Sequence, residues 1–80
     1  MSTTATLTEL IVDIYRDTLQ DAGLDEDSDF FEAGGDSLIA FQITARLRDE
    51  LDVAVPVALV FAYPSPAELA AVVASDIQLA

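Results

Sequence analysis

The sequence predicts an all-α domain: a small four-helix bundle with three longer helices, one short helix and a long loop between the first two. In three stretches of ten or more residues, apolar side chains recur at three- and four-residue spacing. Only residues 52–56 have strand-like composition, and no second strand is evident, so we interpret them as an extended connector. Residues 1–80 are expected to form one domain, ordered over about residues 6–78.

The first helix is predicted to begin after Thr6, which fits a capping box with Glu9. The residues before Thr6 are expected to fray. Gly23 stands where a left-handed residue would end this helix. Its predicted apolar face consists of Leu7, Leu10, Ile11, Ile14, Tyr15, Leu19 and Ala22.

A long acidic loop is predicted over residues 24–36. Its acids are Asp25, Glu26, Asp27, Asp29, Glu32 and Asp36. A loop of this length needs an anchor to stay ordered, so we expect at least one of Phe30 and Phe31 to pack on the helices.

The second helix is predicted from Asp36 or Ser37 to about Leu51, with Asp36 as its N-cap. The core face is expected to contain Ile39, Ala40, Ile43, Thr44, Leu47 and Leu51. Leu38, Phe41 and Ala45 form an apolar strip on another face. Burial under the loop or the short helix and docking of a partner are both open interpretations of this strip.

A short helix is predicted over residues 57–62, before Tyr63 and Pro64. The last helix has a strong start signal: Ser65 as N-cap, Pro66 at the first helical position and Glu68 to close a capping box. Its buried stripe is expected to be Leu69, Val72, Val73 and Ile77.

Charge and composition exclude several classes of function. The chain has 15 acidic residues, three arginines and a net charge of −12, so nucleic acid and anionic membranes are poor partners and basic protein surfaces are good ones. No apolar run approaches the roughly 18 residues of a membrane span, and no signal peptide is evident, so we expect a cytoplasmic protein. Without His, Cys or Lys there is no ordinary base near neutral pH and no reactive thiol or amine, so we expect no catalysis by the chain itself.

The turn before the second helix has two interpretations from its residues alone. The first is a plain glycine turn followed by a helix cap. The second is a calcium loop with Asp25, Asp27 and Asp29 at positions 1, 3 and 5 and Asp36 at position 12. Phe30 stands where such a loop requires glycine, and position 12 is not glutamate, so this pattern is weak and no metal is expected.

A resemblance gives the turn a third interpretation. The segment Phe30-Phe31-Glu32-Ala33-Gly34-Gly35-Asp36-Ser37-Leu38 resembles the attachment motif of phosphopantetheine carrier proteins, the peptidyl and acyl carriers of nonribosomal peptide and polyketide assembly lines. The Arg46-Leu47-Arg48 region and residues 59–66 also resemble this family, and the resemblance covers nearly the whole chain.

The resemblance implies that Ser37 is the covalent site of 4'-phosphopantetheine, which a phosphopantetheinyl transferase moves from coenzyme A. The thiol of that arm then carries an acyl or aminoacyl group as a thioester. Gly35 and Asp36 are expected to belong to the cofactor-binding site with Ser37. Gly34 and Gly35 are expected to leave space for a partner's backbone. By resemblance, Asp36 helps the transferase hold its metal, while a simple N-cap role stays open beside it.

The branch of the family and the partners are expectations of the same kind. The glycine motif is similar to peptidyl carriers, residues 59–66 are similar to polyketide acyl carriers, and Asp36 departs from the His frequent in peptidyl carriers. The mixture suggests a free-standing carrier in a hybrid pathway. We expect a monomer, because partners need access around Ser37. It would meet an acyl- or aminoacyl-loading enzyme and acyltransferase, ketosynthase or condensation-type enzymes. The expected interface consists of Leu38, Phe41, Ala45, Leu59, Ala62 and Tyr63, with Glu32 and Asp36 steering basic partners. An acidic docking module without a prosthetic group is the alternative.

Overall fold

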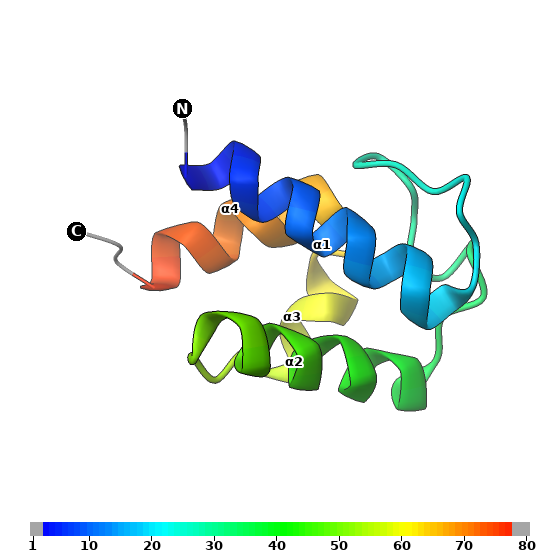
Figure 1. Cartoon of the computed structure of the whole chain (residues 1–80). Helices are drawn as coiled ribbons and strands as arrows, with labels where there is room; N and C mark the ends of the chain where they lie inside the picture. Colours follow the sequence, from blue (N-terminus) through cyan, green and yellow to red (C-terminus); the bar gives the residue numbers. More distant parts are fainter. Residues whose placement is uncertain (1–2, 78–80) are drawn as a thin grey trace.

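The computed structural model describes residues 3–77, and that part of the chain contains four helices and no strand. They are α1 (Thr3–Leu19), α2 (Ser37–Leu51), α3 (Val57–Ala62) and α4 (Pro66–Ile77). Helix α1 packs against α4 and α2, and the short α3 packs against α2, while the long loop closes one end of the bundle (Figure 1). The prediction of an all-α bundle with three longer helices and one short helix is confirmed. Among these described residues, no helix is long and apolar enough to cross a membrane.

The core draws side chains from every helix and from the loop. Its buried members are Leu7, Ile11, Ile14, Tyr15, Leu24, Phe30, Ala40, Ile43, Leu47, Val60, Leu69, Ala70 and Val73. Most of them belong to the predicted apolar faces. Ile39, Thr44 and Leu51 on α2 are only half-buried, as is Val72 on α4. The side chain of Ile77 and all of Gln78 lie outside the described residues.

The predicted ends of the first helix are wrong. No glycine or proline separates Thr3 from the amphipathic stretch, so α1 begins at Thr3 and Thr6 lies inside it. At the other end Gln20, with φ 54°, takes the left-handed conformation expected of Gly23. The Asp21 N–H then donates to the Arg16 carbonyl at 3.0 Å, as in a Schellman motif.

The early end of α1 has a tertiary cause. Leu24 is buried in the core, so the chain must reverse direction soon after Leu19. The Arg16 Nε donates to the Leu24 carbonyl at 2.8 Å and holds this return. A helix continued to Ala22 would carry Leu24 away from the core.

The start of α4 follows the prediction closely. Pro66 is its first residue, and the Ser65 hydroxyl accepts from the Glu68 N–H at 3.2 Å. The Ser65 hydroxyl also donates to the Glu68 carboxylate at 2.9 Å, so the two side chains pair directly. The predicted N-cap is therefore confirmed, and the short α3 has its predicted bounds.

Besides Leu24, the long loop is held to the rest of the bundle through Phe30 and Glu26. Phe30 is fully buried and meets the Tyr15 ring edge-on, with centroids 6.0 Å apart. The Pro64 carbonyl accepts from the Phe30 N–H at 2.7 Å and from the Tyr15 hydroxyl at 3.4 Å. The Ala67 N–H donates to the Glu26 carbonyl at 3.0 Å. Phe30 is thus the anchor that the loop was expected to need.

Tyr15 should make the fold sensitive to alkali. Burial raises the pKa of Tyr15 above its ordinary value of 10.0, and the charges of Asp29 and Glu68 raise it further. As the pH rises, the Tyr15 hydroxyl therefore loses its proton at a lower pH in the unfolded chain than in the folded chain. The free energy of unfolding should then fall as the pH rises above about 10. Urea unfolding at a series of pH values should show this decline, and Tyr15→Phe should flatten it. Tyr63→Phe, at an exposed tyrosine, should keep the decline; an unchanged slope in Tyr15→Phe would contradict the assignment.

Candidate functional site

Ser37 is the first residue of α2, where the long loop becomes helix. Its side chain is exposed, and within residues 3–77 its hydroxyl has no hydrogen bond. Asp36 before it is extended, at φ −140° and ψ −175°, and its carboxylate accepts from the Ile39 N–H at 3.0 Å. The capping role of Asp36 is confirmed. The Ser37 oxygen therefore lies at a helix N-terminus, where backbone N–H groups and the helix dipole favour an anion.

The two glycines before this helix have different roles. Gly34 has φ +96°, a conformation that favours glycine, and a Cβ there would meet no atom within 4 Å. A Cβ on Gly35 would instead lie 2.5 Å from Cε1 and Cε2 of Phe30, and the Gly35 N–H donates to the Phe30 carbonyl at 2.8 Å. Space is therefore open at Gly34. At Gly35 the expectation of space for a partner is wrong, because the chain's own Phe30 ring fills it.

Gly35→Ala should lower the free energy of unfolding by about 1–3 kcal/mol, because the added methyl group overpacks the Phe30 ring. Urea denaturation of wild type and variant measures this loss. In a Phe30→Leu background the same change should cost less, since the ring atoms that it strikes are gone. Equal losses in both backgrounds would show that the ring is not the cause.

The structure adds an exposed aromatic pair that was not predicted. Phe31 and Phe61 are 49% and 37% exposed, and their rings stack at 5.9 Å and 18°. Both also meet the edge or face of Phe30, at 5.4 Å and 6.1 Å. The loop and α3 thus present a joint aromatic surface. The alternation of buried Val60 and exposed Phe61 was the available signal, but a six-residue helix is too short for periodicity to decide.

Most of the predicted interface residues are exposed. Leu38 is 66% and Phe41 59% exposed, so the strip on α2 is free of the loop and of α3. The other exposed members are Glu32, Asp36, Ala45, Ala62 and Tyr63. Leu59 is a correction: it is half-buried and packs against the core, because it lies on the inner side of α3.

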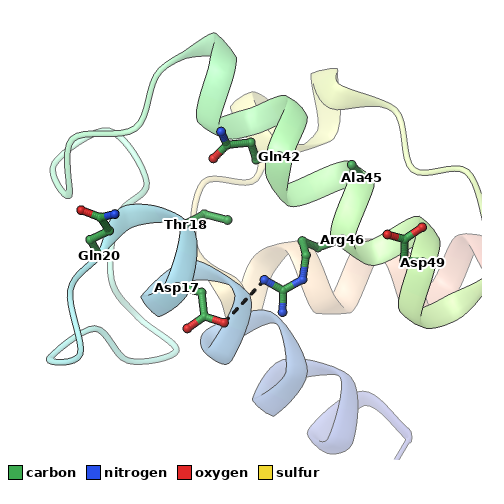
Figure 2. Close-up of a pocket in the computed structure, with 7 residues that line it drawn as sticks. All are labelled: Asp17, Thr18, Gln20, Gln42, Ala45, Arg46 and Asp49. Atoms are coloured by element: carbon green, nitrogen blue, oxygen red, sulfur yellow. Dashed lines mark hydrogen bonds and ion pairs between the residues drawn. The ribbon is translucent and has the colours of Figure 1, made fainter.

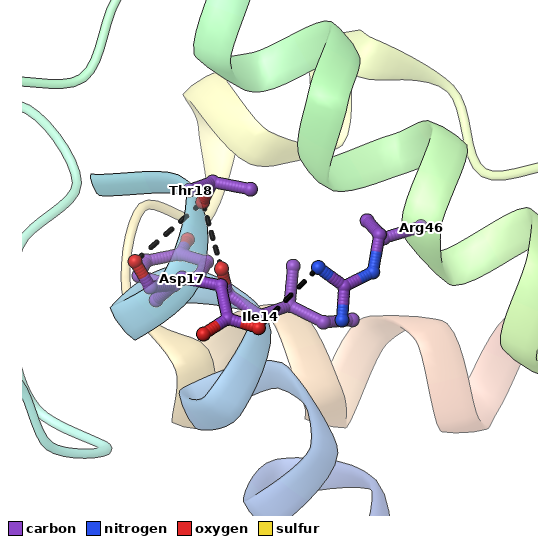
Figure 3. Close-up of polar contacts among 5 residues, drawn as sticks. Ile14, Asp17, Thr18 and Arg46 are labelled. Carbon is purple, nitrogen blue, oxygen red and sulfur yellow. Dashed lines mark hydrogen bonds and ion pairs between the residues drawn. The ribbon is translucent and has the colours of Figure 1, made fainter. Parts of the chain in front are cut away.

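A groove of about 380 Å³, lined mostly by polar residues, lies between α1 and α2 (Figure 2). Its lining consists of Asp17, Thr18, Gln20, Gln42, Ala45, Arg46 and Asp49. The Arg46 guanidinium reaches across to the Asp17 carboxylate at 3.5 Å (Figures 2 and 3). The Thr18 hydroxyl turns back to the Ile14 carbonyl at 2.8 Å (Figure 3). The Arg46–Asp17 contact joins the two helices, while the Thr18 hydrogen bond stays within α1. Ser37 is not among the residues that line this groove.

The acidic loop uses its carboxylates on its own backbone. Asp25 accepts from the Asp27 N–H at 2.9 Å and from the Ser28 hydroxyl at 3.2 Å. Asp29 accepts from the Glu32 N–H at 2.9 Å. Within the described range, no three acidic, His or Cys side chains gather into a group that could hold a metal ion. The calcium interpretation therefore gains no support.

Comparison with known proteins gives one consistent result. A family model described as the phosphopantetheine attachment site matches residues 5–73. The chain is 42% identical over 66 residues to the nonribosomal peptide synthetase CymA of Salinispora arenicola, covering 82% of this chain and 1% of that protein. Its fold is similar to BlmI, a type-II acyl carrier protein of Streptomyces verticillus, with a TM-score of 0.89, 23% identity and coverage of 94% and 90%. A peptidyl carrier protein solved with the phosphopantetheine transferase Sfp and coenzyme A gives a TM-score of 0.81 at 29% identity, with coverage of 86% and 90%.

Proposed function

This chain belongs to the phosphopantetheine attachment-site family of carrier proteins, and from that premise we propose that Ser37 is the residue that bears the group. Its cofactor is 4'-phosphopantetheine, and its function is that of a carrier in nonribosomal peptide or polyketide synthesis. The chain spans about 1% of the synthetase that it matches, so its cargo and the proteins that it serves belong to the proposal.

The observation that carries the proposal is the Ser37 hydroxyl. It is exposed at the first position of α2, and no described residue forms a hydrogen bond with it. A phosphodiester on this oxygen would meet the positive end of the helix. The open side of Gly34 leaves room beside it, and Asp36 fixes the turn by capping α2. The residues present therefore fit the group.

The division of labour follows from the side chains that the sequence lacks. When bound, phosphopantetheine supplies the thiol that holds the acyl or aminoacyl group. The chain has no Cys to offer that thiol and no His or Lys to take the proton from the Ser37 hydroxyl. We therefore propose a non-catalytic domain whose hydroxyl is activated by a transferase and whose cargo is loaded and removed by other enzymes.

The proposed partners are a phosphopantetheinyl transferase, an acyl- or aminoacyl-loading enzyme, and acyltransferase, ketosynthase or condensation-type enzymes. The solved complex of a similar carrier with a transferase supports the first of these. Exposed Leu38 and Phe41 offer an apolar contact beside Ser37, and exposed Glu32 and Asp36 favour basic surroundings on the partner.

A loading assay tests the proposal. The folded chain is incubated with coenzyme A and a broad-specificity phosphopantetheinyl transferase, and its intact mass is measured. We expect a gain of one phosphopantetheinyl group. A folded chain that gains no mass would contradict the carrier function and favour an acidic docking module without a prosthetic group.

Phe41→Ser should slow this loading and leave the circular dichroism spectrum almost unchanged. Phe41 is 59% exposed, so its ring contributes little to the core and is available to a partner. The initial loading rate and the helical signal are measured together. Loss of helicity in this variant would show that Phe41 supports the fold, and an unchanged rate would remove it from the transferase interface.

A further inference from the structure

The exposed face of α2 has unlike charges at its two ends. Leu38, Phe41, Ala45 and Arg48 recur at three- and four-residue spacing and are all exposed, so they form one strip, the α2 strip. Its N-terminal end adjoins Asp36 and the acidic loop. Its other end is the cation Arg48. Along the strip, a partner therefore meets an acid at Asp36, apolar side chains, and the cation Arg48, beside which the acids Asp49, Glu50 and Asp52 are also exposed.

The Arg48 side chain differs from those of the other two arginines in having no ion-pair partner among the described side chains. The Arg16 guanidinium lies 3.8 Å from the Asp13 carboxylate, and that of Arg46 lies 3.5 Å from Asp17. Among the side chains described over residues 6–75, none forms an ion pair or hydrogen bond with the Arg48 side chain. This is notable in a chain with 15 acids, with Asp52 one turn away.

The neighbouring acid of Arg48 points to a different side of the helix. Asp49 lines the groove that faces α1, together with Arg46 (Figure 2). Arg48 instead borders a shallow hollow of about 250 Å³ on the other flank of α2. That hollow is lined by Phe41, Thr44, Ala45, Arg48, Ala54 and Val55. The guanidinium thus lies beside exposed apolar surface and forms no ion pair with a described side chain.

We propose that Arg48 is an orienting contact for the transferase that modifies Ser37, and that it pairs with a carboxylate of that enzyme. This inference rests on the proposed function. The transferase acts on the Ser37 oxygen itself, so it must cover the start of α2. Arg48 lies 11 residues further on (48 − 37), or about 16 Å along the helix axis. A standard interface of about 800 Å² per partner is a disc of about 16 Å radius, so such a footprint reaches Arg48.

The chemistry of the partner surface follows from the strip. Basic groups face Asp36 and Glu32, an apolar patch covers Leu38 and Phe41, and an acid faces Arg48. A transferase docked in the reverse direction would place like charges together at both ends, which disfavours that orientation. Arg48 lies at the rim of the footprint, so its effect belongs to the association step more than to the chemical step.

Loading kinetics with a broad-specificity phosphopantetheinyl transferase and coenzyme A test this inference. Arg48→Glu and Arg46→Glu are matched variants, because each changes the net charge from −12 to −14 (−12 − 2). We expect Arg48→Glu to raise the KM for the carrier about three- to tenfold with kcat nearly unchanged, and Arg46→Glu to change KM less than about twofold. Arg48→Lys should stay near wild type, and high salt should reduce the difference.

The outcomes separate the inference from the function on which it rests. If wild type loads and both glutamate variants have the same KM, the orienting role of Arg48 is overturned while the carrier function stands. If wild type does not load, the carrier function fails and the inference fails with it. Circular dichroism checks the fold of each variant. If Arg48→Glu loses helicity, the orienting role of Arg48 is tested with Arg48→Gln, which removes the charge without adding an acid. A KM within error of wild type for Arg48→Gln would then overturn the inference.

Discussion

Ser37→Ala is expected to abolish the mass gain that we expect of wild type with coenzyme A and a phosphopantetheinyl transferase. The substitution removes the acceptor oxygen, and no other hydroxyl stands at the exposed start of α2. The fold should be almost unaffected, because Asp36 caps the helix and the Ser37 side chain is exposed. Intact-protein mass spectrometry measures the first effect, and circular dichroism measures the second.

The matched control is Ser28→Ala, at a serine of the loop that leads to Ser37. Its hydroxyl accepts from the Asp25 N–H at 2.8 Å and thus has a structural role within the loop. This variant should load like wild type. A mass gain in folded Ser37→Ala, or its loss in folded Ser28→Ala, would move the attachment site away from Ser37.

Phe30→Ala should lower the free energy of unfolding by about 3–5 kcal/mol, the usual cost of deleting a fully buried phenylalanine. A small domain has only about 5–15 kcal/mol in total, so this loss removes a large share of its stability. The ring contacts Tyr15, Phe31 and Phe61 and fills the space against Gly35. Urea denaturation followed by circular dichroism measures the loss.

The same truncation one residue later is the control. Phe31 is 49% exposed, so Phe31→Ala should cost about 1 kcal/mol. Similar losses for the two variants would mean that Phe30 is not the anchor of the loop. The contrast matters for function, because Phe30 supports the glycine turn that presents Ser37.

Local patterns were sufficient wherever neighbouring residues decide the conformation. Asp36 caps α2 and Ser65 caps α4 as predicted, because a side-chain oxygen reaches N–H groups three residues ahead. The short α3 ends before Tyr63-Pro64, since proline disfavours helix at the residue before it. The aromatic anchor was also foreseen as a requirement, although the choice between Phe30 and Phe31 was not.

Long-range contacts decided the remaining features. Helix α1 ends at Leu19 because Leu24 must reach the core, and no local signal at Gln20 competes with Gly23 as a terminator. Leu59 faces inward, and Phe61 stacks on Phe31 from the distant loop. These outcomes depend on residues far apart in the sequence, which periodicity within one segment cannot place.

The amino-acid sequence by itself determined the helical bundle, the capped start of α2 at Ser37, and a set of side chains without Cys, His or Lys. Those properties follow from side-chain types and their spacing along the chain. Only the tertiary structure decided that Gly35 is closed by Phe30 while Gly34 is open, and that Phe41 is exposed. It also decided that Arg48 has no acidic partner among the described side chains, because packing determines which surfaces meet.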